Sequence, residues 1–380
     1  MYQRKPGFKG ILQTSRLTQL VTKICLLLTV GILFLSPLAA GKGEAEGVLK
    51  VVDRMGREVT FLKPAGRVAA IGPGALRLCT YFQNPDMVIA IEQMDKDDAK
   101  GKPYVMANPG YKDLPVIGAG GPNNAPDPEK ILASRPDVVF TTYGGDRSGA
   151  DKLQEKINIP VVALNYGDVR VFDPELYASI RLIGEVIGQE ERALAIIDYM
   201  ESLREDLWQR TRDISDDEKP FVYVGAVNVR GSHGIESTQG KYVLFDVVNA
   251  KNVVDELGKV GSLMIDKEQL IYWDPDIIFL DLGGMEPLRQ DYQKNAWLYQ
   301  ALSAFRNAEV YGQLPFNYYT TNIDTAIANA YYIGKVLYPE RFADIAPETK
   351  ADEIYEELLG KALYKEMAED FGGFTKITFD

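Results

Sequence analysis

Cysteine and histidine are almost absent from this chain of 380 residues, which contains two cysteines and one histidine. Cys25 lies in an apolar run near the start, so Cys79 is alone in the rest of the chain. No intramolecular disulfide is therefore expected in the mature protein. Cys79 stands in an apolar segment and is expected to be a small buried side chain.

The same scarcity weighs against two classes of enzyme. A zinc enzyme, or a site that captures bare zinc, normally takes several His or Cys ligands. A Ser–His–Asp triad could use only His233, and the G-x-S-x-G sequence of many hydrolases is absent. We therefore expect no catalytic residues, no cofactor and no resident metal.

Basic residues are also outnumbered, because the whole chain carries a net charge of −12. The first forty residues hold five basic and no acidic residues, so the remainder carries −17. A protein that binds nucleic acid usually presents excess positive charge to the phosphates. The charge balance therefore argues against a nucleic-acid partner.

Residues 1–40 have the three parts of a secretory signal peptide. A basic segment precedes the apolar run Ile24 to Leu35, and the small residues Ala39-Ala40 follow. The run has about 12 residues, whereas a membrane-spanning helix needs about 20. We expect secretion to the periplasm or the cell exterior. Retention of this segment as an N-terminal anchor is the alternative to cleavage.

One stretch of the chain occurs twice, at residues 127–145 and 266–284. In each copy an Asp is expected to cap a short helix, and the residue before Pro is expected to leave the helical conformation. A β-branched run then predicts a buried strand, which a Gly-Gly turn closes. The residues that recur at one offset of 139 are Asp127/Asp266, Glu129/Glu268, Pro136/Pro275, Asp137/Asp276, Gly144/Gly283 and Gly145/Gly284.

The duplication predicts an α/β fold with two similar lobes and a ligand cleft between them. Apolar residues at helical spacing from Leu194 to Leu207 predict a long helix between the copies. We expect an N-terminal α/β lobe at 48–188, the connecting helix at 189–213 and a C-terminal α/β lobe at 214–380.

Smaller elements are expected inside the two lobes. They are a hairpin that turns near Gly56, a polar loop at 95–115, a strand at 221–229 and helices at 242–249, 295–305 and 324–337.

Further segments occur in a characteristic order along the chain: Asp53–Val59, Arg67–Gly74, the two repeat copies and Trp297–Tyr311. Together they resemble the cluster A, or class III, substrate-binding proteins of ABC importers, a group that captures ferric siderophores, haem and cobalamin. The resemblance covers nearly the whole mature chain. It implies two Rossmann-like lobes joined by a single long connecting helix, and a monomer that delivers its ligand to an importer's permease and ATPase. It also implies that one surface Glu of each lobe docks on basic permease residues, and Glu129 and Glu268 match those positions.

The cleft is expected to be built by loops at the carboxyl ends of the strands. The turn before a short helix offers backbone N–H groups to an anion, and aromatic walls with polar tips offer contact area. An Arg suits a carboxylate, catecholate or oxyanion, and the lone His is either a ligand or a structural residue. Each of these residues could instead serve only turns or packing. The expected ligand-binding residues are Gly74, Ala75, Tyr143, Asn165, Tyr166, Arg230, His233, Asn317 and Tyr318.

Several cargoes fit such a cleft. An anionic metal complex, such as a ferric siderophore-like chelate, is favoured because each loop brings about one Arg and several neutral donors. A small oxyanion such as molybdate or tungstate is the second candidate, and a corrinoid or haem is within the range of the same group. The same lobes could also serve a ligand-sensing module of a surface receptor. A bare ferric ion would need several Tyr and carboxylate ligands, which the sequence does not place.

Overall fold

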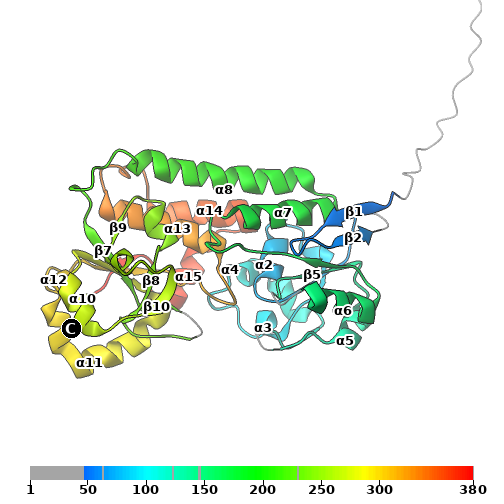
Figure 1. Ribbon diagram of the computed structural model, residues 1–380, viewed down its shortest axis with the longest axis horizontal. Helices are drawn as coiled ribbons and strands as arrows, with labels where there is room; N and C mark the ends of the chain where they lie inside the picture. Colours follow the sequence, from blue (N-terminus) through cyan, green and yellow to red (C-terminus); the bar gives the residue numbers. More distant parts are fainter. Residues whose placement is uncertain (1–46, 62–63, 122–123, 144–146, 229–230, 380) are drawn as a thin grey trace, which may run out of the picture. The chain divides into compact units, whose positions relative to one another are not determined.

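Two separate sheets form the framework of the unit Val48–Asp380 (Figure 1). The computed structural model describes residues 47–61, 64–121, 124–143, 147–228 and 231–379. The expected signal peptide at 1–40 lies outside the described residues and stays a prediction. Among the residues that are described, no helix is long and apolar enough to cross a membrane.

The N-terminal lobe is built on a four-stranded parallel sheet of order β4-β3-β5-β6. Its strands are β3 (Val68–Ile71), β4 (Val88–Ala90), β5 (Val138–Thr141) and β6 (Val161–Ala163). The antiparallel hairpin of β1 (Leu49–Val52) and β2 (Glu58–Phe61) precedes it and turns at Gly56, as expected. The helices of this part are α2 (Ala75–Thr80), α3 (Gln93–Lys96), α4 (Pro103–Met106), α5 (Pro128–Ser134), α6 (Arg147–Ile157) and α7 (Pro174–Ile187).

The C-terminal lobe is built on a five-stranded sheet of order β13-β12-β11-β7-β9, parallel except for its edge strand β13. The strands are β7 (Phe221–Gly225), β9 (Lys251–Asn252), β11 (Ile277–Asp281), β12 (Val310–Gln313) and β13 (Thr375–Lys376). A small antiparallel pair joins β8 (Ser237–Gly240) to β10 (Gly261–Met264). The helices are α9 (Val243–Asp246), α10 (Lys267–Trp273), α11 (Met285–Ala301), α12 (Ser303–Arg306), α13 (Ile323–Leu337), α14 (Pro347–Leu359) and α15 (Tyr364–Phe371).

Helix α8 (Glu190–Thr211) connects the two sheets along the chain and has 22 residues, about 33 Å at the usual helical rise. Figure 1 shows it extending past elements of both lobes. Its apolar face packs into one hydrophobic core that also contains Phe140 of the first sheet and Phe279 of the second. The expected fold class, two Rossmann-like α/β lobes joined by a single long helix, is confirmed.

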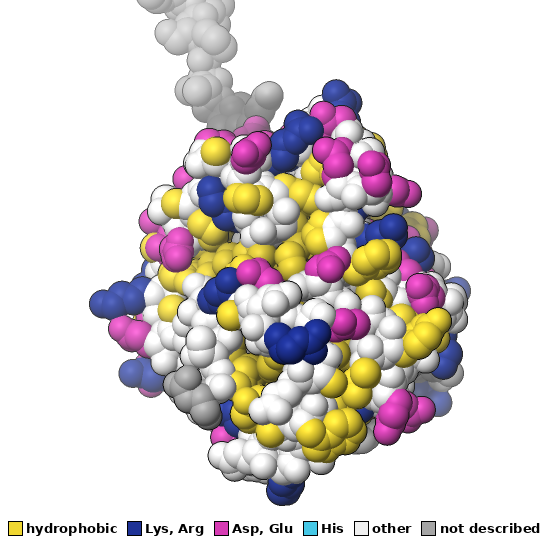
Figure 2. Space-filling view, turned by 90° about the vertical axis from the view of Figure 1, so that its left-hand side faces the viewer, with side chains coloured by type: hydrophobic (Ala, Val, Ile, Leu, Met, Phe, Trp, Pro, Cys, Tyr) yellow, Lys and Arg dark blue, Asp and Glu magenta, His cyan; other side chains and the backbone are white. Residues whose placement is uncertain are grey.

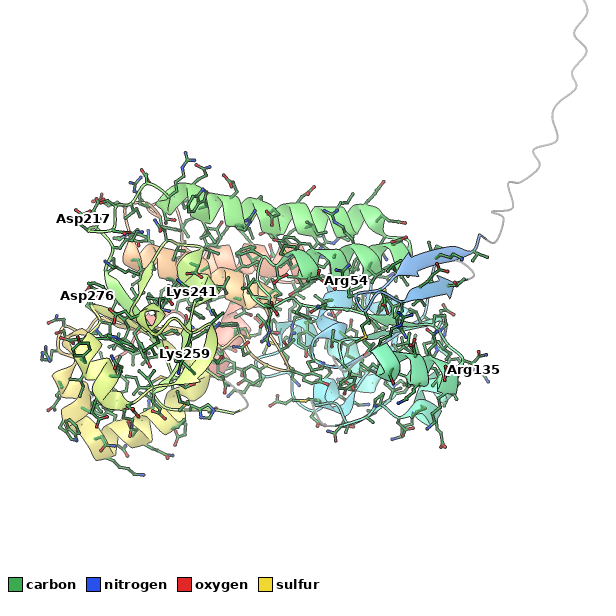
Figure 3. All side chains as sticks on the ribbon, in the orientation of Figure 1. Arg54, Arg135, Asp217, Lys241, Lys259 and Asp276 are labelled. Atoms are coloured by element: carbon green, nitrogen blue, oxygen red, sulfur yellow. The ribbon has the colours of Figure 1, made fainter. Side chains whose placement is uncertain are left out.

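The repeated sequence builds the same helix and strand in both lobes, as α5–β5 and α10–β11. In each copy the residue before Pro ends the helix in a left-handed conformation, with φ 53° at Arg135 and φ 39° at Asp274. Figure 3 shows Arg135 and Asp276 at opposite ends of the unit, so the copies lie far apart.

The Asp after that Pro ties its strand to the neighbouring one in both copies. The Oδ2 of Asp137 accepts from the backbone N–H of Gly66 and of Arg67, both at 2.9 Å, beside β3. The Oδ2 of Asp276 accepts from the N–H of Phe221, the first residue of β7, at 2.8 Å. The duplicated Asp is therefore a strand-joining residue.

The expected capping holds in only one copy. Asp127 accepts from the N–H groups of Glu129 and Lys130, whereas the Asp266 side chain makes no cap hydrogen bond. Gly283 and Gly284 form a 3₁₀ turn, and Gly144 and Gly145 lie outside the described residues.

Several expected elements have different bounds in the structure. The polar loop at 95–115 contains the end of α3, all of α4 and a 3₁₀ turn at Pro109–Asp113, and Tyr104 of α4 is fully buried. The strand from 221 ends at Gly225, since Ala226 has φ 58°. The helix at 242–249 is only α9, and Asn249 has φ 54°.

The expected helix at 295–305 is two helices with other bounds. α11 begins at Met285 and breaks its helical dihedrals at Asn295, whose Nδ2 donates to Asp291. The helix then ends at Ala301, and α12 follows.

Candidate ligand-binding cleft

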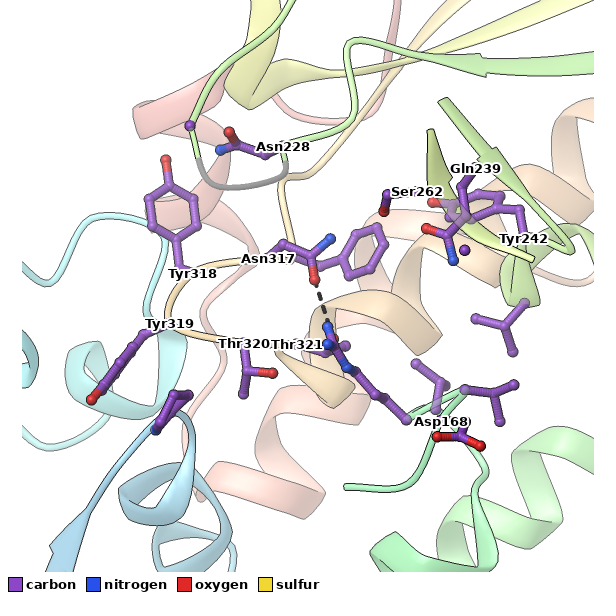
Figure 4. A pocket seen from close by; sticks show the side chains of 18 of the residues that line it. Asp168, Asn228, Gln239, Tyr242, Ser262, Asn317, Tyr318, Tyr319, Thr320 and Thr321 are labelled. Carbon is purple, nitrogen blue, oxygen red and sulfur yellow. Dashed lines mark hydrogen bonds between the residues drawn. The ribbon is translucent and has the colours of Figure 1, made fainter. Parts of the chain in front are cut away.

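A pocket of about 780 Å³ is lined by residues of both lobes (Figure 4). The N-terminal lobe contributes Pro73, which follows β3, and residues 168–171, which follow β6. The C-terminal lobe contributes Asn228 after β7, Ser262 in β10 and residues 316–321 after β12. The pocket therefore lies where parallel strands end, which is the usual ligand position in such sheets.

A second compartment of about 370 Å³ adjoins the pocket on the side of the N-terminal lobe. Arg54, Thr142 and Asn165 contribute to its lining. Pro73, Arg170 and Thr320 line both compartments, so they stand at the junction.

Arg170 is the cation of this junction. Its side chain is exposed, and within the described residues it forms no ion pair. Among the described residues its hydrogen-bond partner is the Thr321 hydroxyl, to which Nη1 donates at the long distance of 3.4 Å. Most of the five N–H donors of the guanidinium are therefore directed at solvent or ligand. The sequence interpretation missed this residue, although it follows the Asn165–Gly167 loop that was singled out.

Arg54 brings no net charge to the second compartment. Its Nε and Nη2 donate to the carboxylate of Glu175 at 3.0, 2.7 and 2.6 Å. Such a bidentate pair neutralises the guanidinium. Asp168 also lines the main pocket but forms no ion pair with Arg170, and the other side chains among the described lining residues are uncharged.

Four of the expected ligand-binding residues lie at the two compartments. Asn317 and Tyr318 line the main pocket, and Asn165 and Tyr166 line the second. Figure 4 shows Tyr318 pointing toward Asn228 across the pocket. The ring of Tyr166 is buried and its hydroxyl donates to the Gly74 carbonyl at 2.9 Å, so it also serves packing.

Gly74 and Ala75 lie beneath the pocket wall. Gly74 has φ 85°, and a Cβ there would lie 2.6 Å from Thr320 Cγ2 and against the Tyr166 hydroxyl. A glycine is therefore required by both backbone and space. Ala75 is fully buried, and the described lining residue of this turn is Pro73.

Tyr143 belongs to a buried hydrogen-bond network. Its hydroxyl donates to Oε1 of Glu92 at 2.6 Å, and Glu92 is fully buried. The other oxygen, Oε2, accepts from the Gly72 N–H and from the Tyr319 hydroxyl, both at 2.8 Å. The sequence interpretation did not single out Glu92, because only the tertiary structure brings Tyr143 and Tyr319 into contact with its carboxylate.

The loop expected to carry Arg230 and His233 borders the pocket. Arg230 lies outside the described residues, so its role as an anion clamp stays a prediction. Gly231 and Ser232 line the pocket, and the Ser232 hydroxyl donates to the Gly283 carbonyl at 2.9 Å. His233 is half-buried next to them, and its role as a ligand stays a prediction.

A buried carboxyl lies below the wall of the C-terminal lobe. Burial raises the pKa of Asp281 to about 7, against the opposing effect of hydrogen bonds from the backbone N–H groups of Gly283 and Asn228. Asp281 is paired in register with Gln313, whose Nε2 donates to the hydroxyl of the pocket residue Tyr242 at 2.8 Å. The proton on Asp281 keeps negative charge away from this part of the cleft below neutral pH.

The two expected docking residues are exposed at the start of equivalent helices, Glu129 in α5 and Glu268 in α10. Tyr272 follows Glu268 by one helical turn, and 81% of it is exposed. The face of the unit that carries α10 to α12 shows hydrophobic side chains scattered among charged ones (Figure 2). The docking role stays a prediction.

Comparison with known proteins gives consistent matches over most of the chain. A sequence model of the family described as periplasmic binding protein matches residues 99–313. The molybdate-binding protein MolA of Haemophilus influenzae is 22% identical over 326 residues, which cover 80% of this chain and 89% of that protein. An uncharacterised ABC transporter substrate-binding lipoprotein of Bacillus subtilis, YvrC, is 23% identical over 77% of this chain and 86% of its own.

Solved structures share the fold. A periplasmic solute-binding protein from Veillonella parvula superposes with a TM-score of 0.69 at 19% identity, covering 86% of this chain and 97% of that one. MolA with bound molybdate superposes with a TM-score of 0.64 at 20% identity, covering 83% and 98%. At these identities the likeness shows the architecture and leaves the ligand open.

Proposed function

Because this chain belongs to the periplasmic binding protein family, the substrate-binding components of ABC importers, we propose that its cargo is an anionic metal complex, such as a ferric siderophore-like chelate. It holds this cargo between its two lobes and delivers it to a permease and its ATPase. The family is one of solute-binding proteins and not of enzymes. Secretion through residues 1–40 is part of the same proposal.

The observation that carries the choice of cargo is Arg170 at the junction of two compartments. One cation without an ion-pair partner in the described structure suits one spread negative charge, because a charge-assisted hydrogen bond is stronger than a neutral one. Asp168 is the acid among the described lining residues and leaves the guanidinium unpaired, while Asn228, Ser262 and Asn317 are neutral. A large anion with low charge density matches this lining.

The size of the cleft supports the same choice. Pockets for ligands of several hundred daltons have volumes of about 300–1,000 Å³. The main pocket of about 780 Å³ lies in that range before the adjoining 370 Å³ is added. Tyr318 and Phe316 offer aromatic surface to an organic chelator. A tetrahedral oxyanion would leave most of this space to water.

A small oxyanion is the second candidate, and one observation favours it. The relative MolA, which aligns with most of this chain, is named a molybdate-binding protein. The neutral donors of the pocket could hold molybdate if the lobes came closer together. In that case Arg170 and few other residues would touch the ligand.

Native mass spectrometry and metal analysis of unwashed protein from its own host test the proposal. We expect one metal ion per chain together with the mass of an organic chelator. If the bound mass is that of molybdate or tungstate, with no organic chelator, the cargo is the oxyanion and not the chelate. A bound organic molecule without any metal would contradict both.

Docking on the permease is the second part of the proposal. Glu129 and Glu268 carry unneutralised charge at equivalent places of the two lobes, within the described structure. Each also has an exposed apolar neighbour on its helix, Leu132 at 43% and Tyr272 at 81% exposure. Tyr is one of the residue types enriched in interface hot spots, so Tyr272 is the stronger candidate contact of the two.

A further inference from the structure

The loop 317–322 leaves the C-terminal lobe but is bound to the N-terminal lobe. It follows β12 of the second sheet and supplies Asn317 to Thr321 to the pocket wall. Two neighbouring side chains of the loop point in different directions: Tyr318 points toward Asn228, and Tyr319 points toward the N-terminal lobe (Figure 4).

Arg77 of α2 holds the backbone of this loop. The guanidinium is fully buried, and its Nη2 donates to the Tyr318 carbonyl at 2.8 Å. Its Nε donates to Oδ1 of Asn322 at 2.7 Å, and both Nη atoms approach the Tyr319 carbonyl at 3.5 Å. The guanidinium also stacks on the Tyr104 ring at 4.5 Å. The charge of Arg77 is thus solvated by the carbonyl groups of a ligand-binding loop.

Side chains of the loop add further bonds to the same lobe. The Tyr319 hydroxyl donates to Glu92 at 2.8 Å and accepts from the Gly121 N–H at 2.8 Å. The Nδ2 of Asn322 donates to the Gly101 carbonyl at 2.8 Å. Each of these partners belongs to the N-terminal lobe.

The backbone of the loop needs this support. Tyr319 has φ 49° and Thr320 has φ 72°, so two consecutive residues with side chains are left-handed. Such a conformation is disfavoured for a residue with a Cβ and persists only where surrounding contacts impose it.

In the part of the opposite wall that the structure describes, we find no comparable link to the N-terminal lobe. Within the described residues, the Ser232 hydroxyl donates to the Gly283 carbonyl and the Gln239 carbonyl accepts from Asn252, and both partners belong to the same lobe. Ser262 lies in the small sheet of β8 and β10. The C-terminal lobe therefore supplies two walls: the loop 317–322 is bonded to the N-terminal lobe, and the wall of Ser232 and Ser262 is bonded within its own lobe.

We propose that Arg77 is a positioning residue. Together with Glu92 it holds the loop 317–322 in its ligand-binding conformation and fixes it to the N-terminal lobe, even when no ligand is bound. That this loop contacts the cargo rests on the proposed function. That the loop is fixed to the N-terminal lobe does not depend on the proposed function. A relative movement of the lobes then displaces the Ser232 and Ser262 wall and leaves the loop in place. Ligand meets a wall that is already ordered, which lowers the ordering entropy lost on binding.

Hydrogen exchange of the ligand-free protein tests the attachment. In Arg77→Met we expect the peptide spanning 316–323 to exchange at least tenfold faster than in wild type. The carbonyls of its left-handed backbone lose the guanidinium N–H groups that donate to them, so the loop opens more often. Arg77→Lys keeps a cation with three donors and should give an intermediate rate. Arg210→Met is the matched control, since Arg210 also stacks on an aromatic ring and donates to a carbonyl, away from the cleft. It should leave this peptide unchanged.

Equal exchange of the peptide in folded Arg77→Met and in wild type would overturn the proposal, and so would equal acceleration in the control. If Arg77→Met does not fold, Tyr319→Phe removes only the hydroxyl that joins Glu92 to Gly121. That variant should accelerate exchange in the same peptide, and an unchanged rate would also overturn the proposal.

A binding measurement separates this inference from the proposed function. If the loop is ordered in one tenth of Arg77→Lys molecules, affinity for the retained host cargo falls about tenfold. The exchange experiment needs no ligand. A wrong assignment of cargo would therefore leave its result intact.

Discussion

Replacing Asp281 by Asn should make the stability of the protein less dependent on pH. Asp281 is fully buried, and burial raises its pKa from an ordinary value near 3.8 to about 7. Below pH 4 the carboxyl is protonated in both the folded and the unfolded state. As the pH rises from about 4 to 7, the unfolded chain ionises while the folded protein keeps its proton, so stability is lost over this window.

The magnitude follows from the shift of the pKa. A difference of about three units at 1.36 kcal/mol each amounts to about 4 kcal/mol by pH 8. Asn cannot ionise, so the variant should lack this loss. Its stability relative to wild type should rise by up to about 4 kcal/mol between pH 4 and pH 8.

Urea denaturation followed by circular dichroism at half-unit steps from pH 4 to 8 measures this difference. Asp113→Asn removes one exposed carboxylate and serves as the control for net charge. Asp95 has a pKa raised by burial to about 6 and remains in all three proteins, so its contribution cancels. Parallel curves for wild type and Asp281→Asn would refute a protonated Asp281 beneath the cleft.

Three further predictions concern the cleft and the docking face. Arg170→Ala should weaken cargo binding roughly 10- to 100-fold in calorimetry, because a charged hydrogen bond contributes about 1.5–3 kcal/mol. Gly74→Ala should destabilise the protein by more than the roughly 1 kcal/mol of a left-handed backbone, since its Cβ meets Thr320. The double reversal Glu129→Lys with Glu268→Lys should abolish uptake by cells while calorimetric affinity for the cargo stays unchanged.

Each prediction has a matched control. Arg181→Ala removes an exposed Arg of α7 and should leave affinity intact. Gly258→Ala has φ 62° and no atom near its Cβ, so it isolates the backbone contribution in denaturation. Glu185→Lys with Glu205→Lys reverses two exposed charges on α7 and α8 and should transport normally. Normal uptake by the docking variant, or equal effects in variant and control, would contradict the assignment concerned.

Local patterns predicted the repeated elements well. Pro136 and Pro275 end their helices and the β-branched runs form buried strands, because these effects depend on neighbouring residues alone. Element bounds failed where a residue takes a left-handed backbone, as Ala226 does after β7, or where a side chain bonds to a close neighbour inside a helix. Asn295, which bonds to Asp291 inside α11, is the clearest example.

The candidate site was predicted in part. Asn317 and Tyr318 follow a recognisable strand, so the rule that ligands bind at strand ends found them, and both line the pocket. The same rule applied to the loop after β6 would have reached Arg170. Tyr143 and Tyr166 also follow strands, but their hydroxyl groups are committed to Glu92 and Gly74, which no local pattern reveals.

The sequence by itself determined the duplicated helix–strand unit, the connecting helix and hence a two-lobed α/β chain, because hydrophobic period, prolines and glycines act over a few residues. Only the tertiary structure decided what the cleft is made of. Arg77 and Asn322 are 245 residues apart in the chain and 2.7 Å apart in the fold. A buried guanidinium must find acceptors wherever the packing brings them, so its choice of the loop 317–322 is a property of the assembled lobes.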